Sequence, residues 1–219
     1  MGIVQRDSFR ITIISYAGAV IGYLNKIFLF TNFLDTHQVG LANLLITISV
    51  LYAQVAALGS YNIVLRFFPF FRDRSKQHNG FLSGVMAISL AGFIMATLVF
   101  LLLLKPFDAA YQASRPLLVE YVFFIIPLAL ASMYYQVFEA YLRSLFKNII
   151  PSLAHEIVLR LLITFSVLLF ALGLIDFRGF VIIYVAGHCL PPIMLILYTA
   201  WIRQLLLSFR LSPMLRRMS

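Results

Sequence analysis

Residues 81–104 read FLSGVMAISLAGFIMATLVFLLLL and contain no Asp, Glu, Lys or Arg. A helix that crosses the hydrocarbon core of a bilayer needs roughly 20 mainly apolar residues, so this stretch is long enough to span a membrane. Further stretches of similar length and composition are separated from it by charged and turn-rich segments. We therefore predict six transmembrane helices, at residues 11–33, 39–65, 81–104, 117–141, 151–175 and 179–202.

The composition of the whole chain favours the same fold class. Of its 219 residues, 62% are hydrophobic and 11% are charged, whereas a soluble domain is about half apolar and roughly a quarter charged. The apolar runs are long and lack the short alternation typical of membrane β-barrel strands. The longest connection, residues 66–80, is too short for a soluble domain. We expect an all-α polytopic membrane helix bundle that forms one domain over residues 1–219.

The formal net charge of +9 comes from bases that lie between the apolar runs. This placement fits an orientation signal and contact with anionic lipid headgroups, and it provides no stripe of bases and aromatic residues for nucleic acid. We expect lipid, and not nucleic acid, as the partner. The single cysteine, Cys189, excludes a disulfide within the chain and a thiol-rich metal site.

The N-terminal apolar run has some features of a signal peptide. Arg6 and Arg10 precede it, and Ala17-Gly18-Ala19 is similar to a cleavage site. The run continues to Phe33, however, far beyond the apolar region of a signal peptide. We therefore interpret it as the first transmembrane helix.

The loops differ in their content of Lys and Arg, which are retained on the cytoplasmic side of a membrane. One side of the bundle holds three bases, Lys105, Arg115 and Arg178. The other side holds twelve, Arg6, Arg10, Arg66, Arg72, Arg74, Lys76, Arg143, Lys147, Arg203, Arg210, Arg216 and Arg217. We therefore expect both termini to be cytoplasmic.

The first span contains an ionisable residue, Lys26, next to Asn25. Such a side chain at mid-bilayer costs about 2.5–3.5 kcal/mol on insertion scales, so it calls for an explanation. In one interpretation Lys26 reaches the outer headgroups while Gly18 and Gly22 form a helix-packing face. In the other, Asn25 and Lys26 belong to a polar path through the membrane.

Polar residues line one face of the second span. Asn43, Thr47, Gln54 and Tyr61 recur at intervals of four and seven residues, which places them on the same side of a continuous helix. This face could make hydrogen bonds to neighbouring helices or form the wall of a hydrated cavity. Either use requires the face to point away from lipid.

The fourth and fifth spans also carry polar faces. The face on the fourth span holds Ser132, Gln136, Glu139 and Arg143. Glu139 can pair with Arg143, and Glu156 can pair with Arg160 on the fifth span, because residues four apart are neighbours on a helix. The two pairs could be structural, or they could form a gate whose members exchange partners during transport.

The sequence contains no recognisable catalytic site. Asp35 and His37 lie close together, but nothing forms a carboxylate pair, a His-acid motif or a glycine-rich phosphate loop. His188 lies beside Cys189 without a second ligand at metal-binding spacing, so we expect it to bond a neighbouring carbonyl. We expect no enzymatic activity, no cofactor and no metal site.

Three segments resemble a known family of membrane proteins. They are GYLNK at residues 22–26, LGSYNIVLRFFP at residues 58–69 and FEAYLR at residues 138–143. They are similar to the amino-terminal half of bacterial oligosaccharide flippases, the polysaccharide-biosynthesis branch of the multidrug/oligosaccharidyl-lipid/polysaccharide exporter superfamily. The resemblance extends over essentially the whole chain.

The resemblance implies a protein of the bacterial inner membrane that moves undecaprenyl-pyrophosphate-linked sugars outward by alternating access, without direct nucleotide hydrolysis. Such a cargo serves the synthesis of cell-surface polysaccharide or lipopolysaccharide. Its pyrophosphate and sugars need a hydrated, cationic cavity, while its polyprenyl tail can remain in lipid. On this basis Lys26, Arg66 and Arg160 are candidates for phosphate contact. Asn25, Asn43, Gln54 and Gln136 are further candidates for the substrate path.

The chain differs from this family in size, because family members have twelve to fourteen spans in two similar lobes that enclose the cavity. Two copies could assemble, a second polypeptide could supply the other lobe, or the chain could be a truncated product without transport activity. A different hypothesis is a non-transporting membrane subunit that scaffolds a polysaccharide synthase. A membrane-embedded transferase is the least favoured alternative, because the sequence offers no acid–base constellation.

Overall fold

The computed structural model describes residues 3–72, 77–111 and 116–204, and the regular structure within these ranges is entirely helical. Six stretches are long and apolar enough to cross a membrane, namely Gln5–Phe33, Thr36–Ala56, Phe81–Leu104, Leu117–Ser144, Ile149–Ala171 and Phe177–Trp201. The predicted all-α polytopic bundle of six spans is therefore confirmed. The chain is a multi-pass membrane protein.

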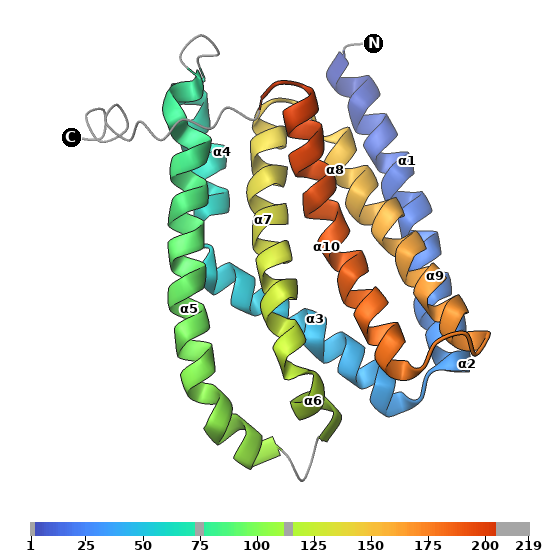
Figure 1. Cartoon of the computed structure of the whole chain (residues 1–219). Coiled ribbons are helices and arrows are strands. Elements are labelled where there is room, and N and C mark those ends of the chain that lie inside the picture. Colours follow the sequence, from blue (N-terminus) through green and yellow to red (C-terminus); the bar gives the residue numbers. More distant parts are fainter. Residues whose placement is uncertain (1–2, 73–76, 112–115, 205–219) are drawn as a thin grey trace.

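Several spans are built from more than one helical element (Figure 1). The elements are α1 (Ile3–Tyr23), a first π-helical segment (Leu24–Phe30), α2 (Thr31–Phe33), α3 (Thr36–Ala56), α4 (Ser60–Phe71), a 3-10 turn (Gln77–Gly80), α5 (Phe81–Tyr111), α6 (Pro116–Tyr121), a second 3-10 turn (Val122–Phe124), α7 (Ile125–Ser144), α8 (Ile149–Leu153), a second π-helical segment (Ala154–Val158), α9 (Leu159–Ala171) and α10 (Phe177–Trp201).

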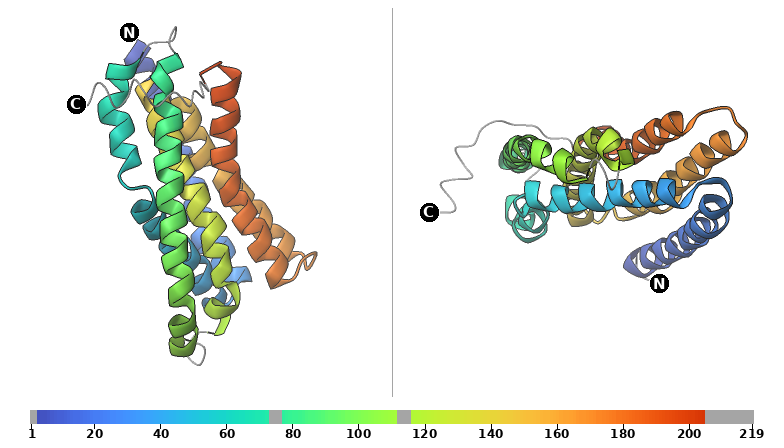
Figure 2. Two further views of the ribbon diagram at one scale, coloured as in Figure 1. Left: turned by 60° about the vertical axis from the view of Figure 1, so that its left-hand side comes forward. Right: turned by 90° about the horizontal axis from the view of Figure 1, so that it is seen from below.

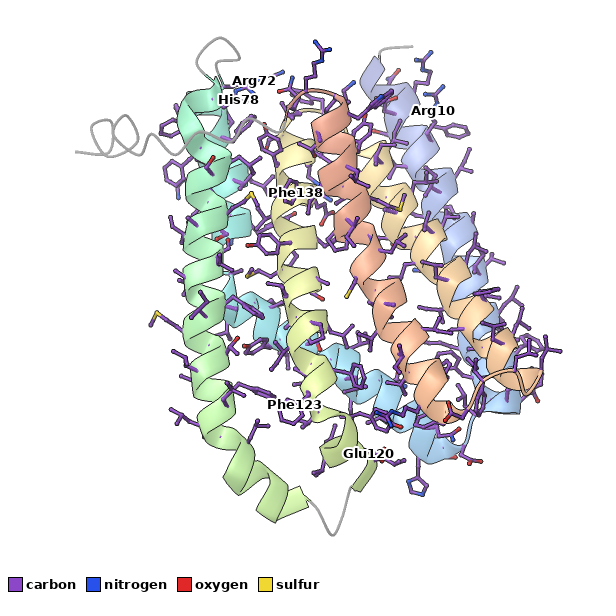
Figure 3. All side chains as sticks on the ribbon, in the orientation of Figure 1. Arg10, Arg72, His78, Glu120, Phe123 and Phe138 are labelled. Carbon is purple, nitrogen blue, oxygen red and sulfur yellow. The ribbon has the colours of Figure 1, made fainter. Side chains whose placement is uncertain are left out.

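The two ends of the described chain lie at the same end of the bundle. Figure 1 shows the start of α1 and the end of α10 close to this end, as six crossings require. Labelled Arg10 and Arg72 also lie there, whereas Glu120 lies at the opposite end (Figure 3). Of the bases used to predict orientation, the following lie outside the described residues: Arg74, Lys76, Arg115, Arg210, Arg216 and Arg217.

The second span is broken, which corrects the prediction of one helix over residues 39–65. α3 ends at Ala56, and α4 starts at Ser60 after Leu58 and Gly59, which have φ angles of 48° and 74°. Glycine adopts this left-handed conformation without the steric cost that a Cβ brings. Beyond the break α4 takes a new direction, while α3 runs obliquely across the bundle (Figures 1 and 2).

The predicted boundaries of the fourth and fifth spans also need correction. The fifth helix ends at Ala171 rather than at residue 175, because Gly173 has a φ of 69° and closes a helix-ending turn. In this turn the Gly173 and Leu174 amides donate to the carbonyls of Phe170 and Leu169 (3.0 and 3.1 Å). The fourth span has a 3-10 turn before α7, where Pro127 cannot donate a backbone hydrogen bond to Phe123.

A buried hydrophobic cluster lies where α4, α5, α7 and α10 meet. Phe68 on α4 is fully buried, with its ring centroid 5.0 Å from that of Tyr141 on α7 and 5.9 Å from that of Phe81 on α5. Phe138, labelled in Figure 3, is buried in the same cluster. In lipid such packing, rather than removal of apolar surface from water, holds helices together. This cluster ties α4, α5, α7 and α10 together.

Large apolar side chains are exposed on the outside of the bundle. On α5, for example, Met95 is 68% exposed and Leu102 is 78% exposed. A soluble protein rarely presents such a surface, but hydrocarbon solvates it readily. The outer face of α5 therefore suits direct contact with lipid.

Candidate functional site

A cavity of about 900 Å³ lies inside the bundle, and five of the six spans contribute to its wall. The third span, α5, does not. Five residues that the sequence predicted for a substrate path line this cavity together: Asn25, Lys26, Asn43, Gln136 and Arg160. They come from four different spans, so the fold converts separate polar faces into one polar wall.

Two other predicted path residues lie elsewhere. Gln54 and Arg66 are exposed and do not line the cavity. The break at Leu58 and Gly59 explains the position of Arg66, because α4 no longer continues the face of α3. Gln54 is on α3 itself, about one helical turn beyond Val50, which lines the cavity. The Arg66 guanidinium instead lies 5.8 Å from the centroid of the Phe67 ring.

Arg160 is held by partners on two helices. Its Nη2 atom donates to Glu156 Oε2 (2.6 Å), and its Nη1 atom donates to the carbonyl of Gly18 on α1. Asn25 Nδ2 in turn donates to the Arg160 carbonyl (2.9 Å), and the Thr164 hydroxyl donates to Asn25 Oδ1 (2.7 Å). This polar clasp ties the first span to the fifth and leaves little uncompensated charge on Arg160.

The glycines of the first span make the clasp sterically feasible. A Cβ at Gly18 would lie 2.6 Å from the Glu156 carbonyl oxygen, and a Cβ at Gly22 would collide with the Arg160 guanidinium. The predicted packing face of Gly18 and Gly22 is thus confirmed, and its partner is the fifth span. Small residues commonly allow such close approach between membrane helices.

Both helices of this pair contain a π-helical segment next to the clasp. Asn25 and Lys26 lie in the first segment, and Glu156 lies in the second. Short π-helical turns inside α-helices occur frequently at functional sites. Here Asn25 is buried against α9 while its neighbour Lys26 is exposed and lines the cavity.

Lys26 has no ion-pair partner among the described residues, unlike Arg160. The cavity wall also contains no Asp or Glu. Since Glu156 compensates Arg160 from outside the wall, Lys26 supplies the fixed positive charge that is left for a ligand. An unpaired base in a cavity among membrane spans favours an anionic ligand.

The second predicted pair, Glu139 and Arg143, is also formed, with a distance of 3.0 Å between Glu139 Oε1 and Arg143 Nη2. Arg143 donates in addition to the Tyr61 hydroxyl on α4 (3.0 Å). Neither member of this pair lines the cavity. In this structure the two ion pairs share no partner, so the exchange of partners between them stays a prediction.

Two histidines complete the polar wall. His188 Nδ1 lies 2.8 Å from the Tyr184 carbonyl, which confirms the expected bond to a neighbouring carbonyl. His155, which the sequence analysis did not single out, lies beside the clasp with Nδ1 3.6 Å from Glu156 Oε1, and its ring centroid is 5.3 Å from that of Tyr135. Its position next to Glu156 and five residues before Arg160 could have revealed it.

Thr47 and Ser132 add two hydroxyl groups to the wall, and much of the remaining lining is apolar. Phe30, Ile46, Val50 and Ile163 contribute to the same wall as the polar groups. The described residues hold no group of three or more His, Cys, Asp or Glu suited to a metal ion. The arrangement can therefore solvate a ligand that combines an anionic or sugar-like part with hydrocarbon.

Comparisons with protein-family models, with curated proteins and with solved structures find no match to this chain. The cavity and its lining residues are therefore the basis on which a function can be inferred.

Proposed function

We propose that this protein is a membrane flippase, or one lobe of one, that moves a polyprenyl-pyrophosphate-linked oligosaccharide for the synthesis of cell-surface polysaccharide or lipopolysaccharide. The observation that carries this proposal is the mixed cavity inside the membrane bundle, with the unpaired Lys26 in its wall. The segments at residues 22–26, 58–69 and 138–143, which resemble oligosaccharide flippases, favour the same cargo.

The proposed cargo requires two kinds of solvent within one site. Its pyrophosphate and sugars need hydrogen-bonding partners and positive charge, because burying unpaired polar groups is costly. Asn43, Gln136 and Lys26 can supply these partners. The volume of about 900 Å³ is at the upper end of ordinary ligand sites, which span about 300–1,000 Å³.

The lipid tail can leave the cavity between the first and second spans. α1 packs mainly against α8, the second π-helical segment and α9, while α3 packs mainly against α7 and α5. α1 and α3 approach each other where α2 connects to α3, and they diverge toward the end of the bundle where α1 begins (Figures 1 and 2). Tyr23 and Ile27 line the cavity on this side. Their side chains are 57% and 50% exposed. A side opening here suits a polyprenyl chain that stays in lipid.

Lys26 is the proposed phosphate contact. Arg160 positions the first span against the fifth and is not itself the phosphate contact, because its guanidinium is already bound to Glu156 and Gly18. Alternating access would then require the pair formed by the first and fifth spans to change its angle to the spans that form the opposite wall. The clasp lets this pair move as one body.

The proposed location is the bacterial inner membrane, with the end of the bundle that carries Arg10 and Arg72 in the cytoplasm. The partners are membrane lipid, the lipid-linked oligosaccharide and a second lobe, supplied by another copy or by a separate chain. An opposing lobe would complete the wall around the exposed Lys26 and leave the side between the first and second spans open to lipid.

The proposal can be tested with purified protein in nanodiscs and a fluorescent undecaprenyl-pyrophosphate-linked sugar. We expect saturable binding that falls at least about tenfold in Lys26→Ala and is unchanged in Arg66→Ala, a matched removal of a base outside the cavity. Equal binding by both variants would refute the role of Lys26. Absence of binding, together with copurification of a synthase, would instead support the scaffold hypothesis.

A further inference from the structure

We propose that the cavity binds its anionic ligand together with a proton, which is taken up on Nε2 of His188. This inference rests on the anion-binding cavity proposed above and adds a chemical coupling to it. It is based on the hydrogen bonding of His188, on the charges around the cavity and on the proline pair that follows His188 in α10.

The hydrogen bond to Tyr184 determines which nitrogen of His188 is free. A carbonyl oxygen can only accept, so Nδ1, 2.8 Å from it, must carry a hydrogen. In the neutral ring Nε2 is then an acceptor, and it has no partner among the described residues. Because His188 lines the cavity, this nitrogen can receive a proton without losing an existing bond.

The proline pair leaves two backbone carbonyls of α10 without their usual helical donors. Pro191 and Pro192 lie inside α10 and also line the cavity. Since proline has no N–H, they cannot donate the helical bonds that the carbonyls of Gly187 and His188 would otherwise accept. Backbone carbonyl oxygens without a helical donor add negative potential to this part of the cavity wall, which favours a positive charge in it.

The other titratable groups around the cavity do not provide an alternative proton acceptor of the same kind. Glu156 lies outside the wall and is bound to Arg160. The titratable groups that line the wall, taken over every contributing span, are Tyr23 and Lys26 on the first, Tyr135 on the fourth, His155 and Arg160 on the fifth, and Tyr184 beside His188 on the sixth. Only the two imidazoles among these change charge near neutral pH in water.

The linkage between proton uptake and anion binding determines how affinity changes with pH. The cavity wall contains no Asp or Glu, so an imidazolium in the empty cavity has no anion to pair with. An anionic ligand pairs with the imidazolium, so binding takes up a proton and the affinity increases as the pH falls. His155 differs from His188 in its surroundings, because its Nδ1 lies 3.6 Å from a carboxylate oxygen of Glu156 before any ligand binds.

The test uses ethane-1,2-disulfonate, whose two negative charges do not titrate near neutral pH, and protein in nanodiscs of zwitterionic lipid. Calorimetry should show affinity at least about tenfold higher at about pH 5.5 than at about pH 8.5, since one pKa unit of coupling corresponds to tenfold. The dependence of affinity on pH should disappear in His188→Gln. It should persist in His37→Gln, because His37 lies in the first turn of α3, outside the cavity. Lys26→Ala should weaken binding at every pH.

A second measurement does not depend on any variant. The heat of ligand binding to the wild-type protein is measured near neutral pH in bis-tris and in tris. It should differ between the two buffers, with the sign expected when the protein takes up a proton. Binding that is independent of pH, or an unchanged slope in a folded His188→Gln variant, would overturn the proton-linked inference alone. Complete absence of disulfonate binding would overturn the anion-binding cavity as well.

Discussion

Arg160 on the fifth span donates a hydrogen bond to the carbonyl of Gly18 on the first span, 142 residues away in the sequence. The same guanidinium binds Glu156 one helical turn earlier. A charged side chain thus closes a contact that ordinarily depends on small residues alone. The clasp separates the two cations of the cavity into a structural one, Arg160, and a free one, Lys26.

The close approach at Gly18 can be tested by adding one methyl group. Gly18→Ala places a Cβ 2.6 Å from the Glu156 carbonyl oxygen, and overpacking of this kind costs about 1–3 kcal/mol. Gly40→Ala on α3 is the control, because a Cβ there meets nothing within 4 Å. Thermal unfolding in detergent should show a lower Tm for Gly18→Ala only. Similar values for both variants would contradict the tight packing of the first and fifth spans.

The two Glu–Arg pairs should differ in strength although they have the same spacing. Glu156 and Arg160 are 25% and 27% exposed, whereas Arg143 of the other pair is 49% exposed. A double-mutant cycle with Gln replacements should give a coupling of about 1–3 kcal/mol for the first pair, and under about 1 kcal/mol for the exposed one. A larger coupling between Glu139 and Arg143 would mean that the clasp is not the stronger pair.

The break in the second span predicts unequal effects of substitution at two adjacent positions. Gly59→Ala forces a Cβ into a left-handed conformation (φ 74°) and should destabilise the protein by about 1–2 kcal/mol. Leu58→Gly relieves the same backbone strain at φ 48°, and the side chain that it removes is already 57% exposed. Any loss of stability in Leu58→Gly should therefore be smaller than in Gly59→Ala. Thermal unfolding of both variants provides the check. If α3 and α4 formed one continuous helix, Gly59→Ala would stabilise it instead.

Hydration of the cavity can be measured by cysteine labelling in a Cys189→Ser background. Asn43→Cys lies in the cavity wall, and Leu102→Cys lies on the outer face of α5, where the native side chain is 78% exposed. A charged, water-soluble thiol reagent needs a thiolate and water, so it should modify position 43 in membranes and leave position 102 unmodified. The reverse pattern would show that α5, and not the cavity, faces water.

Much of this fold follows from local spacing. The six spans were predictable because each needs a long apolar run, and the two ion pairs because residues four apart meet on one helix face. The packing face of Gly18 and Gly22 was also evident as a pattern. These features depend on neighbours within a single helix.

The features that could not be predicted depend on contacts between distant segments. The break at Gly59 is accompanied by Gly92 on α5, where a Cβ would collide with the Ala56 carbonyl, and no local pattern joins these two positions. The same break separates Arg66 on α4 from the polar face of α3 that includes Asn43. His155 was not predicted to line the cavity, because it lies in a π-helical turn that residue spacing does not reveal.

The most direct test of the central claim is to locate the bound headgroup. A polyprenyl pyrophosphate that carries a photoreactive group next to the phosphates should crosslink in membranes to peptides that include Lys26 and the cavity wall. Mass spectrometry should show this labelling reduced in Lys26→Ala and retained in Arg66→Ala. Labelling restricted to the outer face of α5, or unaffected by the loss of Lys26, would contradict a cationic cavity that receives the phosphates.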